Sequence, residues 1–263
     1  MIGRARFAFT VLAFGYAFLY LPIALVMIYS FNESRLVTVW SGFSLKWWSA
    51  LFANQAMMSA AWLSLRVGLL SATLATLLGL AAGYVLARVP RFFGRALFGG
   101  LIIAPMVMPE VVMGISMLLL FVGAERAIGW PDRGLLTIVI GHVTFSLAFV
   151  AIVVQARLAD FDRALEEAAM DLGATPWVTF LTVTLPLIAP AVAAGWLLAF
   201  TLSLDDLILT EFVSGAQSET LPMKVYSSVR LGVDPQINVL ATIVVCIAAS
   251  ALILSAWLTR PRH

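Results

Sequence analysis

Long runs without a charged residue constrain this chain more than any other feature of its sequence. Four such runs contain no Asp, Glu, Lys or Arg and cover residues 7–32, 67–87, 134–156 and 235–259. Each is longer than the ~20 apolar residues that a helix needs to cross the hydrocarbon core of a membrane. These four runs therefore predict four membrane-spanning helices.

Two further apolar runs contain acidic residues. Residues 96–124 are interrupted only by Glu110, and residues 187–212 contain Asp205 and Asp206 near their end. We expect both to span as well, which gives six spans. The predicted fold is all-α and polytopic, with residues 1–263 forming a single transmembrane domain.

The composition supports a chain that is largely surrounded by lipid. Hydrophobic residues make up 62% of it and charged residues only 11%, whereas a soluble domain carries about 25% charged residues. A formal net charge of +2 without a Lys/Arg-rich run argues against a nucleic-acid partner. The first run is too long for the apolar part of a secretion signal, so we expect a retained helix.

The arginines predict the orientation. Six spans put both termini on one side, and the cytoplasmic side holds the denser Lys and Arg residues. The short loop between the second and third spans contains Arg88, Arg91 and Arg95. Further arginines on the same side are Arg4, Arg6, Arg157, Arg163, Arg260 and Arg262. Both termini are therefore expected in the cytoplasm.

The segment 157–186, between the fourth and fifth spans, is predicted to fold into two short helices. Residues 163–172 are rich in helix formers, and Gly173 then supplies the left-handed residue that often follows a helix. Thr175 is expected to cap a second helix with Pro176 at its first position, and Pro186 is expected to end it.

This segment has an unusual number of apolar residues for a loop. An apolar patch bordered by Glu166, Glu167 and Asp171 is typical of a docking surface. The alternative is a folded loop that packs on the protein's own helices.

The sequence argues against an enzyme. A nucleotide-binding Walker A loop needs a Gly-Lys-Ser/Thr sequence, and the two lysines, Lys46 and Lys224, follow Leu45 and Met223. His142 and His263 have no second ligand at helical spacing, so no metal site is predicted. His142 is interpreted as an interhelical hydrogen-bonding residue.

Apart from Glu211, which is interpreted as interfacial, three carboxylates lie within the predicted spans. Glu110 follows Pro105 and Pro109, so its helix is expected to be irregular there, and it is placed ~20 Å from Ala96 along that helix. Asp205 and Asp206 are placed near the outer end of the fifth span. Carboxylates in these positions are expected to face the protein interior or water, where they would attract a cationic substrate. The alternative is a structural role at helix ends, at a partner subunit or in surface water. Because neighbouring helical residues point about 100° apart, Asp205 and Asp206 are not expected to share one role.

The segment 157–186 closely resembles the EAA motif of bacterial ABC importer permeases. The matching residues are Glu167, Ala168, Ala169, Gly173, Val183 (where the family usually has Ile), Leu185 and Pro186. The resemblance implies a type I ABC importer permease of MetI-like architecture, whose motif docks into a groove on the ATPase. By this resemblance, Glu167, Ala168, Ala169 and Gly173 take the coupling role. The other residues of the segment predicted to take part in coupling are Glu166, Asp171, Pro176, Leu185 and Pro186.

Longer stretches, including APMVMPEVVMGISMLLLF and LLAFTLSLDDLILTEFVSG, resemble one of the two permeases of polyamine importers, the putrescine branch most closely. The resemblance implies an inner-membrane heterodimer with a second permease, two copies of an ABC ATPase that bind ATP and Mg²⁺, and a periplasmic polyamine-binding protein. No cofactor is expected in this chain. The rival interpretation is an ion-coupled secondary transporter of organic cations that uses Glu110, Asp205 and Asp206. A membrane-embedded enzyme ranks well behind both.

Overall fold

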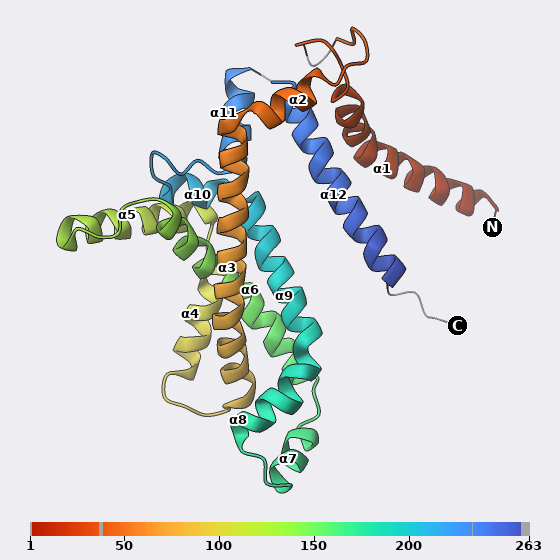
Figure 1. Ribbon diagram of the computed structural model, residues 1–263. Helices are drawn as coiled ribbons and strands as arrows, with labels where there is room; N and C mark the ends of the chain where they lie inside the picture. Colours follow the sequence, from red (N-terminus) through yellow and green to blue (C-terminus); the bar gives the residue numbers. More distant parts are fainter. Residues whose placement is uncertain (1, 37–38, 233, 259–263) are drawn as a thin grey trace. The chain divides into compact units, whose positions relative to one another are not determined.

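The computed structural model describes residues 2–36, 39–232 and 234–258, and these residues form helices and connecting loops without a strand (Figure 1). One isolated antiparallel bridge joins Asn32 and Phe43. The helices are α1 (Ile2–Tyr29), α2 (Lys46–Ala53), α3 (Gln55–Arg88), α4 (Arg95–Val107), α5 (Glu110–Ile128), α6 (Leu135–Ala159), α7 (Ala164–Asp171), α8 (Pro176–Thr179), the π-helical turn η1 (Phe180–Thr184), α9 (Leu185–Asp205), α10 (Ile208–Val213), α11 (Leu221–Leu231) and α12 (Gln236–Leu258). Arg260, Arg262 and His263 lie outside the described residues.

Five helical segments of the described chain are long and apolar enough to cross a membrane. They are Phe9–Tyr29, Gln55–Arg88, Glu110–Ile128, Leu135–Ala159 and Pro176–Asp205. The sixth predicted run coincides with α12, of which Gln236–Ser250 forms a shorter apolar helix by the same measure. The predicted all-α, polytopic membrane fold is confirmed.

The third predicted span is two helices and not one. α4 ends at Val107, Met108 is extended with φ −72° and ψ 139°, and α5 begins at Glu110. Pro109 explains the break, because its ring disfavours helical geometry at the preceding residue and it has no N–H to donate. The irregularity expected before Glu110 is therefore confirmed, and it takes the form of a complete break between two helices. Glu110 lies in the first turn of α5, where a carboxylate interacts favourably with the helix dipole.

The chain divides into two compact units. The first contains Met1–Ser59 and Val225–His263, and in it α12 packs against α1 and α2. The side-chain amide of Asn54 donates to Gln236 Oε1 at 3.0 Å within this unit. The second unit, Ala60–Lys224, contains the loop and the acidic residues singled out above. The single transmembrane domain stays a prediction.

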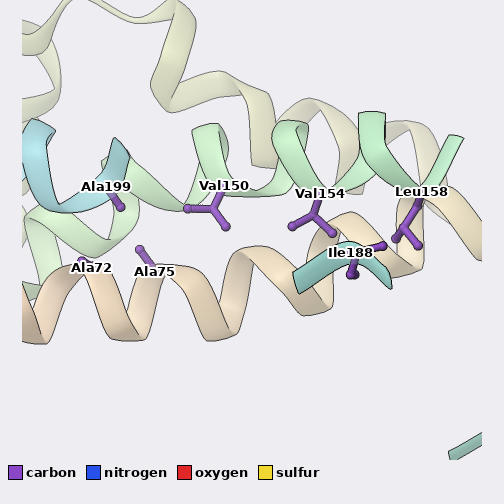
Figure 2. Close-up of a cluster of buried hydrophobic side chains, with 7 residues drawn as sticks. All are labelled: Ala72, Ala75, Val150, Val154, Leu158, Ile188 and Ala199. Carbon is purple, nitrogen blue, oxygen red and sulfur yellow. The ribbon is translucent and has the colours of Figure 1, made fainter. Parts of the chain in front are cut away.

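The core of the second unit is a seam between α3, α6 and α9. Its fully buried side chains are small or branched: Ala72, Ala75, Val150, Val154, Leu158, Ile188 and Ala199 (Figure 2). Gly79 and Gly83 allow α3 to approach α6 closely, since a Cβ atom at Gly83 would lie 2.6 Å from the carbonyl oxygen of Ala151. Small residues are the usual means of close helix packing in lipid, where burial of apolar surface gives little drive.

A second cluster joins α3 and α6 to α5 and α10. Its buried residues are Val67, Met113, Phe121, Ile138, Leu209 and Val213. Gly114 of α5 leaves room for Phe212 of α10, since a Cβ atom there would lie 2.5 Å from the ring. The short α10 is therefore held in the core of this unit and is not a loop on its surface.

Candidate functional site

The loop after α6 has the two-helix geometry that the sequence predicts. α7 ends in a Schellman motif, in which Gly173 N–H donates to the Met170 carbonyl at 2.9 Å and Ala174 N–H to the Ala169 carbonyl at 3.1 Å. Gly173 has φ +92°, the left-handed conformation that this motif requires. Thr175 then caps α8 by accepting the Val178 N–H, and Pro176 occupies the first helical position.

The prediction that Pro186 ends this second helix is wrong. The helix continues from Pro176 to Asp205, and the π-helical turn Phe180–Thr184 accommodates the proline. Leu185 N–H donates to the carbonyl of Phe180, five residues earlier. The wider turn avoids the clash between a proline ring and the carbonyl four residues before it. Leu185 and Pro186 are thus the first residues of α9, which continues the helix that starts in the loop.

This loop has several apolar side chains that are largely exposed in the described chain. Leu172 is 90% exposed and Trp177 is 68% exposed, and further exposed residues are Leu165, Met170, Val178 and Leu181. Glu167, Ala168 and Asp171 are exposed beside them, and Ala169 is half-buried. We call this set of residues the docking face. Apolar patches with a polar rim are typical of protein–protein contacts.

Glu166 does not belong to the rim of this face, contrary to the prediction. It is 9% exposed and points into the protein, where its carboxylate forms an ion pair with Arg88 of α3 at 2.9 Å. The interpretation of a loop that packs on the protein's own helices therefore holds for Glu166, while the docking surface stays a prediction. Glu166 packs on the protein's own helices, while Glu167 and Asp171 remain at the surface.

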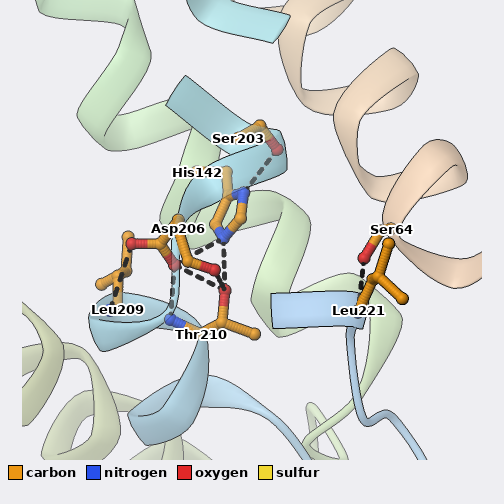
Figure 3. A network of polar contacts seen from close by, with 7 residues as sticks. All are labelled: Ser64, His142, Ser203, Asp206, Leu209, Thr210 and Leu221. Carbon is orange, nitrogen blue, oxygen red and sulfur yellow. Dashed lines mark hydrogen bonds and ion pairs between the residues drawn. The ribbon is translucent and has the colours of Figure 1, made fainter. Parts of the chain in front are cut away.

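A buried polar cluster surrounds His142 of α6 (Figure 3). Its Nδ1 lies 2.6 Å from Ser203 Oγ, and its Nε2 lies 2.8 Å from Thr210 Oγ1 and 3.2 Å from Asp206 Oδ2. The interpretation of His142 as an interhelical hydrogen-bonding residue is confirmed. The cluster joins α6 to the end of α9 and to α10.

Asp206 explains why the fifth span ends where it does. The predicted continuation to residue 212 is wrong, because α9 ends at Asp205 and α10 starts at Ile208. The Asp206 carboxylate accepts the N–H groups of Leu209 at 3.3 Å and Thr210 at 2.8 Å, as well as the Thr210 hydroxyl. Short polar side chains that bond nearby backbone N–H groups favour such breaks and helix starts.

The three predicted acids have different surroundings. Asp205 and Glu110 are exposed, whereas Asp206 is half-buried in the His142 cluster. Asp205 and Asp206 thus have different surroundings, and the expectation that they have different roles stays a prediction. Among the described residues, no three His, Cys, Asp or Glu side chains are grouped as metal ligands would be.

The residues that bond Glu166, His142 and Asp206 could not be predicted from the sequence. In the sequence, Arg88 is only an orientation signal, and Ser203 and Thr210 belong to no motif. The same holds for Thr184, whose hydroxyl donates to Glu166 Oε1 at 2.7 Å. Arg88 and Glu166 are 78 residues apart, and His142 and Thr210 are 68 apart. No local pattern predicts such pairs.

Comparison with known proteins shows the class to which this architecture belongs. The family described as the binding-protein-dependent transport system inner membrane component matches residues 75–260, and the chain belongs to that family. It is therefore a permease subunit of an ABC importer, a multi-pass inner-membrane component and not an enzyme. The family membership sets aside the ion-coupled secondary transporter.

Several relatives match most of the chain. The putrescine transport system permease protein PotI of Escherichia coli (strain K12) is 54% identical over 244 residues, which cover 92% of this chain and 87% of that protein. The spermidine/putrescine transport system permease protein PotC of the same organism is 41% identical over 247 residues, covering 94% and 91%. The molybdenum transport system permease protein ModB of Haemophilus influenzae is 34% identical over 221 residues, covering 77% and 93%.

Solved structures share the fold at low sequence identity. A bacterial ABC transporter involved in the import of the acidic polysaccharide alginate matches with a TM-score of 0.73 at 18% identity, covering 98% of this chain and 96% of the other. The inward-facing MetNI methionine ABC transporter matches with a TM-score of 0.61 at 17% identity, covering 77% and 95%. The MetI-like permease fold is thereby confirmed.

Proposed function

We propose that this chain is one of two different permeases in a polyamine importer, with putrescine as its principal substrate. Its 54% identity to a putrescine permease supports the substrate class. The exposed carboxylates of Asp205 and Glu110 suit a multiply charged cation, which is costly to desolvate without an opposite charge. Asp206 contributes negative charge to the same end of α9.

The docking face carries the proposal that ATP hydrolysis on another subunit drives this chain. A Schellman turn at Gly173 holds α7 against α8, and Leu172 at its tip is 90% exposed. Such a rigid apolar tip fits a groove on an ABC ATPase. Glu167, Ala168, Ala169, Asp171 and Pro176 form or support this face, and Leu185 and Pro186 connect it to α9.

The complete importer that we propose has a second, non-identical permease, two ATPase copies and a periplasmic polyamine-binding protein. ATP and Mg²⁺ bind to the ATPase, and this chain holds no cofactor. Both termini lie in the cytoplasm, which puts the docking face on the same side as the ATPase. The dense arginines at Arg88, Arg91 and Arg95 support this orientation.

Uptake in whole cells tests this proposal. Deletion of the gene should abolish high-affinity uptake of labelled putrescine, and the intact chain should restore it. Excess unlabelled spermidine should compete more weakly than excess putrescine. Unchanged putrescine uptake after deletion, in cells without another polyamine importer, would contradict the proposed substrate.

A further inference from the structure

A buried ion pair lies directly behind the docking face. Arg88 is the last residue of α3, and Glu166 is in the first turn of α7. Arg88 Nε lies 2.9 Å from Glu166 Oε2 and 3.3 Å from Oε1, and the two side chains are 9% and 11% exposed. Ion pairs so well shielded from water are strongly directional and poorly screened by salt.

The pair is bonded to two further elements. The Thr184 hydroxyl, in the π-helical turn before α9, donates to Glu166 Oε1 at 2.7 Å. Arg88 Nη1 donates to the carbonyl of Leu158 in α6 at 3.0 Å, and the guanidinium lies 5.4 Å from the centre of the Phe161 ring. Two side chains therefore connect α3, α6, α7 and the start of α9. Arg163 reinforces this with a 3.0 Å bond to the Ala87 carbonyl.

Glu166 and its neighbour Glu167 point in different directions. Glu167 is exposed beside the docking face, while both oxygens of Glu166 are taken up by Arg88 and Thr184 inside the chain. Successive helical residues point about 100° apart, so α7 presents one glutamate outward and the other inward. Glu166 is not available to an ATPase docked on this face.

We propose that Arg88 and Glu166 are positioning residues that make α7 move as one body with α3, α6 and α9. This rests on the proposed function, since it takes α7 as the element that docks on the ATPase. Displacement of the docked helix is then passed to three spanning helices through the ion pair and the Thr184 and Leu158 bonds. Without the pair, α7 still docks but moves independently of those helices.

Glu166→Gln and Glu167→Gln form a matched pair of neighbouring substitutions. In complexes reconstituted with the partner permease, ATPase and binding protein, we measure ATPase retained, ATP hydrolysed and putrescine taken up. Glu166→Gln should keep the ATPase bound but lower putrescine uptake per ATP by roughly fivefold or more, a typical size for coupling between sites. Glu167→Gln should weaken ATPase retention and leave uptake per ATP unchanged in the complexes that form.

A double variant separates positioning from simple stability. Arg88→Met/Glu166→Leu removes both charges at similar volume, which buried ion pairs often tolerate without loss of stability. It should assemble like the unsubstituted chain yet stay uncoupled, because Met and Leu cannot bond Thr184 or the Leu158 carbonyl. This variant keeps the test valid if Glu166→Gln does not fold.

Three results would overturn the proposal: normal uptake per ATP in Glu166→Gln, loss of ATPase retention in Glu166→Gln with Glu167→Gln unaffected, or full coupling in the double variant. Failure of the proposed function has a different signature. In that case the unsubstituted chain itself would retain no ATPase or take up no putrescine.

Discussion

Asp205 and Asp206 are adjacent in the sequence but have different surroundings. Asp205 is the last residue of α9 and is exposed. Asp206 bonds His142, Thr210 and the backbone at the start of α10. The first is therefore free to meet a cation, and the second also holds the break between the two helices.

Replacing Asp205 tests the proposed contact with substrate. Asp205→Asn keeps the shape of the side chain and removes its charge, so putrescine uptake should fall by about tenfold, the equivalent of ~1.4 kcal/mol. Assembly with the ATPase should be unchanged, because the docking face is not altered. Glu211→Gln removes another exposed carboxylate, from α10, and should leave uptake near normal. Near-normal putrescine uptake in both variants would show that Asp205 does not contact the substrate.

Replacing His142 tests the buried cluster. His142→Leu leaves Ser203, Thr210 and Asp206 without their shared partner, and an unsatisfied buried polar group costs about 1–3 kcal/mol. The thermal unfolding midpoint of the purified complex should fall clearly. Thr144→Val is the control, because the Thr144 hydroxyl bonds only the Ile140 carbonyl of its own helix among the contacts described. An unchanged midpoint in His142→Leu would show that the cluster contributes no stability.

At the scale of single elements, proline and glycine decide the course of the chain in three different ways. Pro109 breaks the third span, whereas Pro186 is accommodated by a π-helical turn within a continuous helix. Gly173 has a left-handed backbone and open space around it. A residue type therefore predicts an irregularity but not its form.

Gly173→Val tests whether the turn between α7 and α8 carries the docking. A β-branched residue at φ +92° is strained by about 1–3 kcal/mol, while no neighbouring atom would clash with it. The protein should insert normally and lose ATPase association or putrescine uptake. Gly94→Val imposes similar strain at φ +81°, also in open space, before α4. We expect Gly94→Val to retain the ATPase, and equal loss in both variants would refute a specific role for the turn.

The sequence predicted elements better than it predicted contacts. Uncharged runs located the spanning helices because lipid excludes charge over a fixed thickness. Gly173, Thr175 and Pro176 located the loop because their backbone preferences are local. The inward turn of Glu166 and the bonding of Asp206 depend on Arg88 and His142, which are distant in the chain. Those placements arise only when the helices pack.

At the scale of the whole molecule, the predicted orientation is open to direct test. Cys246 is the only cysteine, so Cys246→Ser gives a background free of thiols. Single cysteines at Phe93 and Ala174 should be shielded from an impermeant reagent in intact cells, and cysteines at Asp132 and Gln217 should be labelled. Gln217 is chosen because it is exposed, whereas a cysteine at the neighbouring Ser218, which is 7% exposed, would react poorly with the reagent. The reverse labelling pattern would overturn the cytoplasmic placement of the docking face.

The most direct test of the whole account is putrescine uptake by purified transporter in proteoliposomes. The chain is reconstituted with its partner permease and ATPase, with putrescine and binding protein on the side opposite the ATPase. Uptake should require ATP on the ATPase side and the binding protein on the other, and it should persist when ion gradients are collapsed. Putrescine uptake that follows an imposed ion gradient and needs neither ATP nor the binding protein would contradict the proposed ATP-driven import.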